Sequence, residues 1–546
     1  MTELPTGVTQ AAKEGRETMA TPPGVSPADF EAALTEFANV VGAQWVFTDD
    51  DTMDTYRDAY SPLRGEPEDK YASAAVAPTT VEEVQAVVRI ANRYSIPLYT
   101  ISTGRNLAYG GSAPVYSGSV VLDLKRMNRI LEVDEDLAYA LVEPGVSYFD
   151  LYRYLRERGI RLWIDCADPG WGSLIGNALE RGAGRTPLPY RDHFGAHCGM
   201  EVVLANGDVV RTGMGALPNA GANWQAFPYG AGPLADGLFA QSNFGIVTKM
   251  GFWLMPEPEA SMTGRIRAPR HDDVIPLVRT LAHLQYSGIV NCLYSLNSPV
   301  FTGPMDARKS ALLDRPNGGS AAEWDDYAAS LGRPFWETEL RFYGPESVMQ
   351  AQWAHVKERL SAIDGIELED GDVIRFPLTD DQIRRLGDPG AFGIPSLNVF
   401  SSQQGSTGHL DASPMLPHSG RALLEAHKVF LREYRDAGVP LTLGFAMSYH
   451  TRAFIMFHGI SLTLDPEENA KARALYARLI QVAGEHGWGI YRAHVAFMDE
   501  LMATYSYNDH ALMRLNETLK DALDPNGILS AGRYGIWPRH LRRARA

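Results

Sequence analysis

The chain has 546 residues, of which 45% are hydrophobic and 21% charged. At about 150 residues per domain, this length predicts more than one domain, and the composition excludes a disordered protein. Acidic residues outnumber basic ones, giving a formal net charge of −16. Because such a surface repels phosphate backbones and anionic lipid headgroups, we expect neither nucleic acid nor membrane as a partner.

Cysteine usage and the N-terminus bear on the compartment. The three cysteines, Cys166, Cys198 and Cys292, are widely spaced and form no CxxC pair, so they provide neither a disulfide framework nor a cysteine metal site. The first thirty residues lack an apolar signal-peptide core, and no segment approaches the roughly 20 apolar residues of a membrane span. We expect a cytoplasmic protein.

The N-terminal half alternates helical and strand patterns. After a polar tail to about Val25, Thr80 and Glu83 form a predicted capping box that opens a helix over 81–95, followed by a strand over 96–102. Further strands are predicted over 119–124 and 138–146, and a helix over 147–159. Asn206-Gly207 predicts a hairpin in which both residues take positive φ. These elements favour an α+β fold.

The pattern of predicted helices and strands changes at Pro256 and Pro258. The following stretch, to about Trp488, predicts a second domain of antiparallel strands and amphipathic helices. Its clearest helices cover 421–438 and 466–487, ended by Gly438 and Gly487.

A glycine-rich loop follows the strand at 96–102 and contains Gly104, Gly110 and Gly111. Such a loop can direct backbone N–H groups toward a pyrophosphate, or it can be an ordinary turn, and the residues alone leave both open. A GxxxxGK[ST] motif is absent, and the GxG at Gly213 lacks the third glycine of a Rossmann site.

A second glycine-rich stretch, residues 165–184, contains Asp168 and small residues that allow a flat ligand to approach the backbone. The alternative is that Asp168 only caps the following helix. Just beyond it, Asp192, His193 and His197 have the spacing of zinc ligands, which leaves a zinc-dependent hydrolase as a remote alternative.

Two features lie later in the chain. Tyr491-Arg492 places a phenol beside a guanidinium, a pair that can bind a phenolate or carboxylate or can simply pair with a surface acid. His409 lies in the small-residue segment SSQQGSTGHLDASP, where a lone histidine usually faces solvent.

Seven segments in order resemble one family over nearly the whole chain from about residue 70: ISTGRNLAYGGSAP, GSVVLDLKRMNRILEVD, ALVEPGVSY, GSLIGNALERG, MEVVLANGDVVRTGMGALP, QSNFGIVTKMGFWLMP and LDPNGILSAGRYGIWP. They resemble the vanillyl-alcohol oxidase/p-cresol methylhydroxylase flavoproteins, and within that family the bacterial eugenol oxidases and 4-alkylphenol oxidases. The resemblance implies a two-domain α+β fold, with an FAD-binding domain over 1–260 and 491–546 and an antiparallel-sheet cap over 261–490.

The resemblance also implies roles for individual residues. His409 matches the histidine that links FAD covalently, Asp168 the aspartate beside flavin N5, and Tyr109, Tyr491 and Arg492 the trio that binds the phenol oxygen. The remaining FAD contacts it implies are Ser102, Thr103, Gly104, Arg105, Asn106, Leu107, Ser173, Asn177, Gly184, His193, Val247 and Arg533. The implied substrate pocket adds Cys166, Trp171, Arg185, Asp411 and Met456, with no metal.

The implied activity is oxidation of para-substituted phenols. A bound phenolate favours loss of a hydride from the benzylic carbon, and Asp168 then serves as the base for water addition to the p-quinone methide. The implied acceptor is O2, giving hydrogen peroxide, and the implied assembly is a homodimer. The alternative is the dehydrogenase branch, which passes electrons to a cytochrome.

This chain departs from the family's fungal founder, which has a glycine in place of Trp171 and a tyrosine in place of Arg185. Arg185 is hypothesised to recruit an acidic or polar ring substituent, and Trp171 to narrow the pocket or stack on a substrate ring; the alternative is that both residues are structural. A histidine before His193 is also absent, so another base would have to assist attachment of the flavin.

Overall fold

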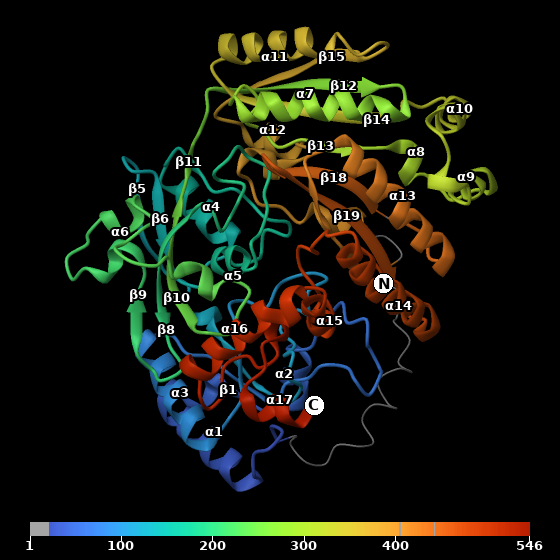
Figure 1. Ribbon diagram of the computed structural model, residues 1–546. Coiled ribbons are helices and arrows are strands. Elements are labelled where there is room, and N and C mark those ends of the chain that lie inside the picture. Colours follow the sequence, from blue (N-terminus) through green and yellow to red (C-terminus); the bar gives the residue numbers. More distant parts are fainter. Residues whose placement is uncertain (1–20, 403–405, 442, 546) are drawn as a thin grey trace, which may run out of the picture.

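The computed structural model describes residues 21–402, 406–441 and 443–545. Most of the predicted N-terminal tail (1–20) and part of the segment before His409 (403–405) therefore lie outside the described residues. The chain forms a lower half, coloured blue to green and red, and an upper half, coloured yellow-green to orange (Figure 1).

A small sheet with three parallel strands begins the lower half, in the order β1-β2-β4-β3. Its strands are β1 (Val46–Phe47), β2 (Ala74–Val76), β3 (Leu98–Ile101) and β4 (Val120–Asp123). Helices α1 (Pro27–Val41) and α3 (Val81–Tyr94) share a buried apolar core with it. Thr80 caps α3 as predicted, but the Glu83 carboxylate reaches back to the N–H of Thr79 rather than of Thr80.

An antiparallel sheet follows, in the order β5-β6-β10-β8-β9. Its strands are β5 (Ile130–Asp134), β6 (Tyr139–Val142), β8 (His197–Val203), β9 (Val209–Arg211) and β10 (Ile246–Trp253). The predicted helix at 147–159 is α4 (Tyr148–Glu157). The β8–β9 hairpin forms as predicted, except that only Gly207 takes positive φ, because the Gly207 N–H closes a turn on the Leu204 carbonyl.

The C-terminal segment returns to this lower half, with α15 (Met498–Ala503), α16 (Tyr507–Leu523) and α17 (Arg539–Arg545) lying against the N-terminal half (Figure 1). The Lys520 ammonium forms an ion pair of 2.7 Å with Asp524, and both side chains are fully buried. Lys520 also donates to the carbonyls of Asn243 and Leu529. Because a buried charge is costly without partners, the contact with Asn243 holds the tail near the start of β10, and a bridge between Leu529 and Leu98 joins the tail to β3.

The upper half is built on an eight-stranded antiparallel sheet in the order β15-β12-β14-β13-β18-β19-β16, with β17 also paired to β19. Its strands are β12 (Ala260–Ala268), β13 (Ser295–Asn297), β14 (Trp336–Gly344), β15 (Glu367–Arg375), β16 (Gly408–Ala412), β17 (Met415–Pro417), β18 (Leu443–His450) and β19 (Ala453–Leu462). The helices packed with it include α7 (Val274–Tyr286), α11 (Glu346–Leu360), α13 (Gly420–Ala437) and α14 (Pro466–Glu485). Gly438 ends α13 as predicted, whereas α14 ends two residues before Gly487.

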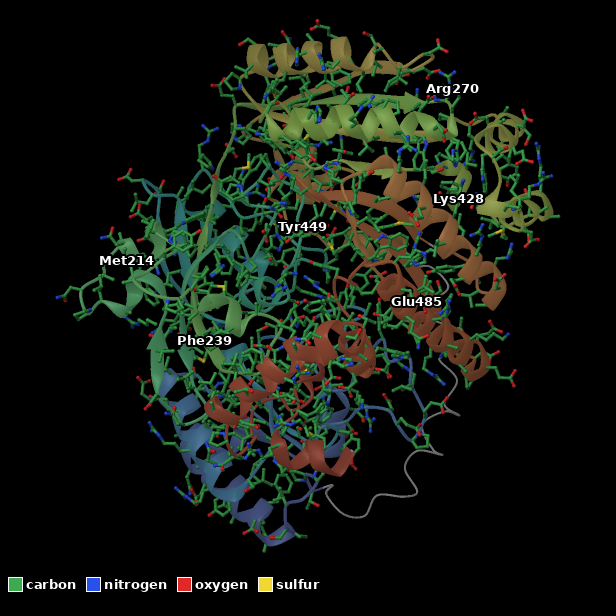
Figure 2. All side chains as sticks on the ribbon, in the orientation of Figure 1. Met214, Phe239, Arg270, Lys428, Tyr449 and Glu485 are labelled. Carbon is green, nitrogen blue, oxygen red and sulfur yellow. The ribbon has the colours of Figure 1, made fainter. Side chains whose placement is uncertain are left out.

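Polar contacts join the two halves near Tyr449, which lies at their junction (Figure 2). Its hydroxyl donates to Asp192 at 2.9 Å, and its carbonyl accepts from the fully buried Arg191. Arg191 also donates to the carbonyl of Asn291. No helix in the described ranges is both long and apolar enough to span a membrane.

Candidate active site

A large cavity, of about 880 Å³, lies where the two halves meet. This volume is at the upper end of ordinary small-molecule sites. Most of the residues that the sequence singled out line it: Ser102, Thr103, Gly104, Arg105, Asn106, Leu107, Tyr109, Cys166, Asp168, Ser173, Asn177, Gly184, Arg185, Val247, His409, Asp411, Tyr491, Arg492 and Arg533. Trp171, His193 and Met456 are not among its lining residues.

The two glycine-rich stretches form adjacent walls of this cavity. Gly104 takes a φ of +64°, which a residue with a side chain rarely adopts. A Cβ on Gly176 would lie 2.3 Å from Ser102 Oγ, so the loop after β3 approaches α5 (Leu174–Leu179) only because that position is glycine. Ser173, not Asp168, caps α5 by accepting the Gly176 N–H, which removes helix capping as the explanation of Asp168.

An arginine between two tyrosines forms one end of the cavity. The Arg492 guanidinium lies 5.2 Å from the Tyr109 ring centre and 4.6 Å from that of Tyr491. Its Nε donates to the carbonyl of Glu180, whereas its buried Nη2 has no hydrogen-bond partner among the described residues. Burial raises the pKa of Tyr491 to about 12, so this phenol stays protonated at neutral pH, and its hydroxyl donates to the carbonyl of Arg181. The arrangement suits an anionic oxygen.

Glu180, which the sequence analysis assigned no role, organises this end. Its side chain pairs with Arg533 and accepts the Tyr534 hydroxyl at 2.8 Å, while its carbonyl orients Arg492. Arg533 also donates to the Tyr99 hydroxyl at 2.8 Å. The residue lies inside the GNALERG motif, but only the fold shows that it connects the N-terminal wall to the C-terminal tail.

Asp168 faces the cavity and pairs with Arg185. The Arg185 Nη2 lies 3.2 Å from Asp168, and its Nη1 lies 2.9 Å from Asp388 of the upper half. Ser396 donates to Asp168 at 3.4 Å. Burial raises the pKa of Asp168 and the Arg185 guanidinium opposes it, leaving the net pKa above the usual aspartate range. No sequence motif identified Asp388 or Ser396, and only the fold shows that they lie beside Asp168 and Arg185.

His193 lies behind the cavity wall rather than on it. Its ring contacts Asn177 Oδ1 at 2.5 Å and Asp165 Oδ1 at 2.8 Å, and all but 4% of the side chain is buried. The same Asp165 carboxylate accepts the backbone N–H groups of Arg185 and Thr186. In this structure, His193 thus holds the wall through its neighbours and does not itself line the cavity, and the flavin contact expected of it stays a prediction.

His409 lies on strand β16, not in an exposed loop, with its side chain 18% exposed. Its Nε2 is 3.3 Å from Asp411, and the Tyr60 ring packs edge-on at 5.4 Å. Burial alone would lower the pKa of His409, but the Asp411 carboxylate outweighs burial and raises it. Asp411 Oδ1 is buried without a partner among the described residues.

Two residues expected in the substrate pocket, Met456 and Trp171, are not among those that line the cavity. Met456 is fully buried in the apolar core of the upper half. Side chains on β19 alternate between two faces, and Phe457, Gly459 and Ser461 lie on the face toward the cavity. Met456 lies on the opposite face. Trp171 packs against Phe400 at 4.9 Å between ring centres.

The zinc alternative receives no geometric support. His193 and His197 contact different carboxylates, Asp165 and Asp236, and Asp192 accepts from Tyr449. Within the described ranges, no group of three or more histidine, cysteine, aspartate or glutamate side chains is arranged to hold a metal ion.

Comparisons with known proteins agree with this geometry. Residues 72–213 match the FAD binding domain, and residues 423–534 match the C-terminal domain of FAD-linked oxidases. The chain is 33% identical over 527 residues to the 4-cresol dehydrogenase [hydroxylating] flavoprotein subunit of Pseudomonas putida, covering 94% of this chain and 97% of that one.

Two solved structures are similar over almost the full length. The 4-ethylphenol oxidase from Gulosibacter chungangensis, solved with isoeugenol, has a TM-score of 0.80 and 35% identity, covering 96% of this chain and 100% of that one. The p-cresol methylhydroxylase structure with substrate bound has a TM-score of 0.81 and 31% identity, covering 95% and 99%. The chain belongs to the vanillyl-alcohol oxidase/p-cresol methylhydroxylase flavoprotein family. It is therefore an FAD-dependent oxidoreductase of a phenol-oxidising family.

The residues present fit FAD. The glycine-lined walls form one cavity large enough for an extended cofactor together with a small substrate. Arg492 Nη2 and Asp411 Oδ1 are buried polar atoms that no described residue satisfies. Because such atoms are costly without partners, they indicate a polar ligand in this space.

Proposed function

We propose that this protein oxidises para-substituted phenols (4-alkylphenols, eugenol-like allylphenols and 4-hydroxybenzyl alcohols) and uses O2 as electron acceptor. The observation that carries the proposal is the Arg492 guanidinium beside the rings of Tyr109 and Tyr491, with an Nη2 that no described residue partners, in the same cavity as Asp168. A cation beside the phenol of Tyr109 suits a phenolate oxygen and leaves the para substituent free to extend along the cavity.

FAD would be held by the loop after β3, the start of α5, Val247 and Arg533, with His409 as the proposed point of covalent attachment. Bound there, FAD supplies a hydride acceptor and a carrier of two electrons. The Asp411 carboxylate lies beside the His409 ring and orients it.

The side chains then divide the chemistry between them. Arg492 and Tyr109 stabilise the phenolate, which increases electron density at the para position and favours loss of a benzylic hydride. Asp168 takes the proton of the water that adds to the resulting p-quinone methide. Its raised pKa makes it a stronger base than an exposed aspartate. Where water is kept out, loss of a proton from the neighbouring carbon gives an alkene instead.

The test is a panel of para-substituted phenols supplied to the aerobic holoenzyme, with hydrogen peroxide release and product identity measured together. We expect peroxide in stoichiometric amounts with 4-alkylphenols, and none with phenols lacking a benzylic hydrogen. Unchanged flavin absorbance after anaerobic addition of every phenol would refute the proposal.

A dehydrogenase subunit that passes electrons to a cytochrome is the second candidate. It is favoured by the 33% identity to the 4-cresol dehydrogenase flavoprotein subunit. Anaerobic reduction by substrate followed by exposure to air separates the two, because slow reoxidation by O2 combined with fast reoxidation by an artificial one-electron acceptor indicates the dehydrogenase. The homodimer expected from the resemblance remains a prediction that a sedimentation measurement can test.

A further inference from the structure

The Asp168 end of the cavity contains two carboxylates and one guanidinium. Arg185 bridges Asp168 and Asp388 through its two terminal nitrogens, at 3.2 and 2.9 Å. All three side chains line the cavity and keep 30%, 37% and 45% exposure for Asp168, Asp388 and Arg185. Ser396 adds a neutral hydroxyl that donates to Asp168.

The other titratable groups near Asp168, Asp388 and Arg185 do not neutralise the net charge of this acidic trio. Cys166 lines the same wall, and burial together with Asp165 and Asp168 raises its pKa well above the usual thiol range, so it is neutral. Asp165 is buried on the far side of the wall, where it accepts hydrogen bonds from His193 and from the backbone of Arg185 and Thr186. When both Asp168 and Asp388 are ionised, the trio carries a net charge of −1.

The two terminal nitrogens of Arg185 are therefore already engaged. A substrate carboxylate that approached the guanidinium would also lie beside Asp168 and Asp388, whose like charges oppose it. Arg185 is therefore a weaker attractant for an acidic ring substituent than an unpaired arginine would be.

We infer that Asp388 is a specificity residue. By pairing with Arg185, it leaves a negative net charge at the end of the cavity that receives the para substituent of the substrate. The enzyme therefore selects phenols with uncharged para substituents and rejects those with a carboxylate. The inference rests on the proposed function, because it places the phenol oxygen at Arg492 and the para substituent toward Asp168.

The probes are 4-hydroxybenzoate and 4-hydroxybenzamide. They are close in shape and differ in the charge of the para substituent, and neither has a benzylic hydrogen, so binding to the FAD-loaded enzyme can be measured by calorimetry without turnover. At about pH 8 we expect the amide to bind about tenfold or more tightly than the acid. Larger discrimination is not expected, because solvent screens partly exposed charges.

Three variants make the test specific. Asp388→Asn neutralises the trio and frees Arg185 Nη1, so the affinity ratio of amide to acid should fall to about one or below. Arg185→Met leaves two unpaired carboxylates, so the ratio should rise above that of the wild type. Asp380→Asn is the matched control, because Asp380 pairs with Arg156 and does not line the cavity; it should leave the ratio unchanged.

The outcomes separate the inference from the function on which it rests. Equal affinity of the two ligands for the wild type, or an unchanged ratio in Asp388→Asn, would overturn the inference while leaving phenol oxidation intact. The comparison on the wild type remains decisive if a variant does not fold. Failure of both ligands to bind, together with failure of 4-ethylphenol to reduce the flavin, would overturn the proposed function and the inference with it.

Discussion

Replacing Arg492 with methionine is the sharpest test of the phenolate site. Arg492 is the cation between Tyr109 and Tyr491, and its Nη2 is buried without a partner. Methionine keeps an unbranched stem of similar width but removes the charge and the hydrogen-bond donors. The change should therefore weaken binding of the phenolate in the ground state and in the transition state.

The expected size follows from the geometry. An ion pair at about 4 Å is worth about 4 kcal/mol at an effective dielectric constant of about 20. A hydrogen bond to a charged group contributes about 1.5–3 kcal/mol by mutation. Because Tyr109 remains as a donor, we take a value between the two, about 3 kcal/mol, which corresponds to about a 150-fold loss of kcat/KM.

The assay is kcat/KM for 4-ethylphenol, measured beside the FAD content and the thermal midpoint of the same preparation. Arg492→Lys keeps the positive charge but loses the planar guanidinium. Its kcat/KM should therefore fall between those of the wild type and Arg492→Met. Arg478→Met is the control, because Arg478 of α14 forms an ion pair with Glu433 of α13 and does not line the cavity. A loss below about fivefold in a folded, FAD-loaded Arg492→Met protein would show that this arginine does not bind the phenol oxygen.

Three further changes test other parts of the structure. Asp168→Asn should slow flavin reduction or product formation by about 10²–10⁴-fold and abolish the acidic limb of the pH–rate profile, because burial raises the pKa of Asp168 and only its ionised form is a base; a normal rate in stopped-flow absorbance would remove it from the chemistry. His409→Ala should lose in-gel flavin fluorescence after denaturation while still binding FAD, and retained covalent fluorescence would mean that another residue is the attachment point. His458, fully buried beside His427, has its pKa lowered by burial from 6.5 to about 3, so it contributes stability that is present above about pH 6.5 and is lost as the pH falls toward 3. His458→Gln should remove up to about 5 kcal/mol of this acid dependence from the free energy of unfolding measured in urea between those pH values, and an unchanged slope would contradict it.

The sequence alone predicted the features that depend on neighbouring residues. The loop from Ser102 to Tyr109 and the small residues around Ser173 lie next to strands or helices that the hydrophobic pattern identifies. Backbone conformation there is set by local residues, such as a glycine at positive φ, so the motif and the cavity wall coincide. The family resemblance added His409 and Arg492, which the pattern alone left open.

The tertiary structure decided which side chains from distant segments meet, and on which face of a strand each one lies. On β19, a shift of one residue separates Met456 in the core from Phe457 at the cavity, because side chains on a strand alternate between faces. Asp168 and Arg185 both belong to the lower half, 17 residues apart, whereas Asp388 lies 203 residues after Arg185, and only the docking of the upper half on the lower one brings it to them. The charge at that end of the site is a sum over all three, so neither Arg185 nor its sequence neighbours could reveal it.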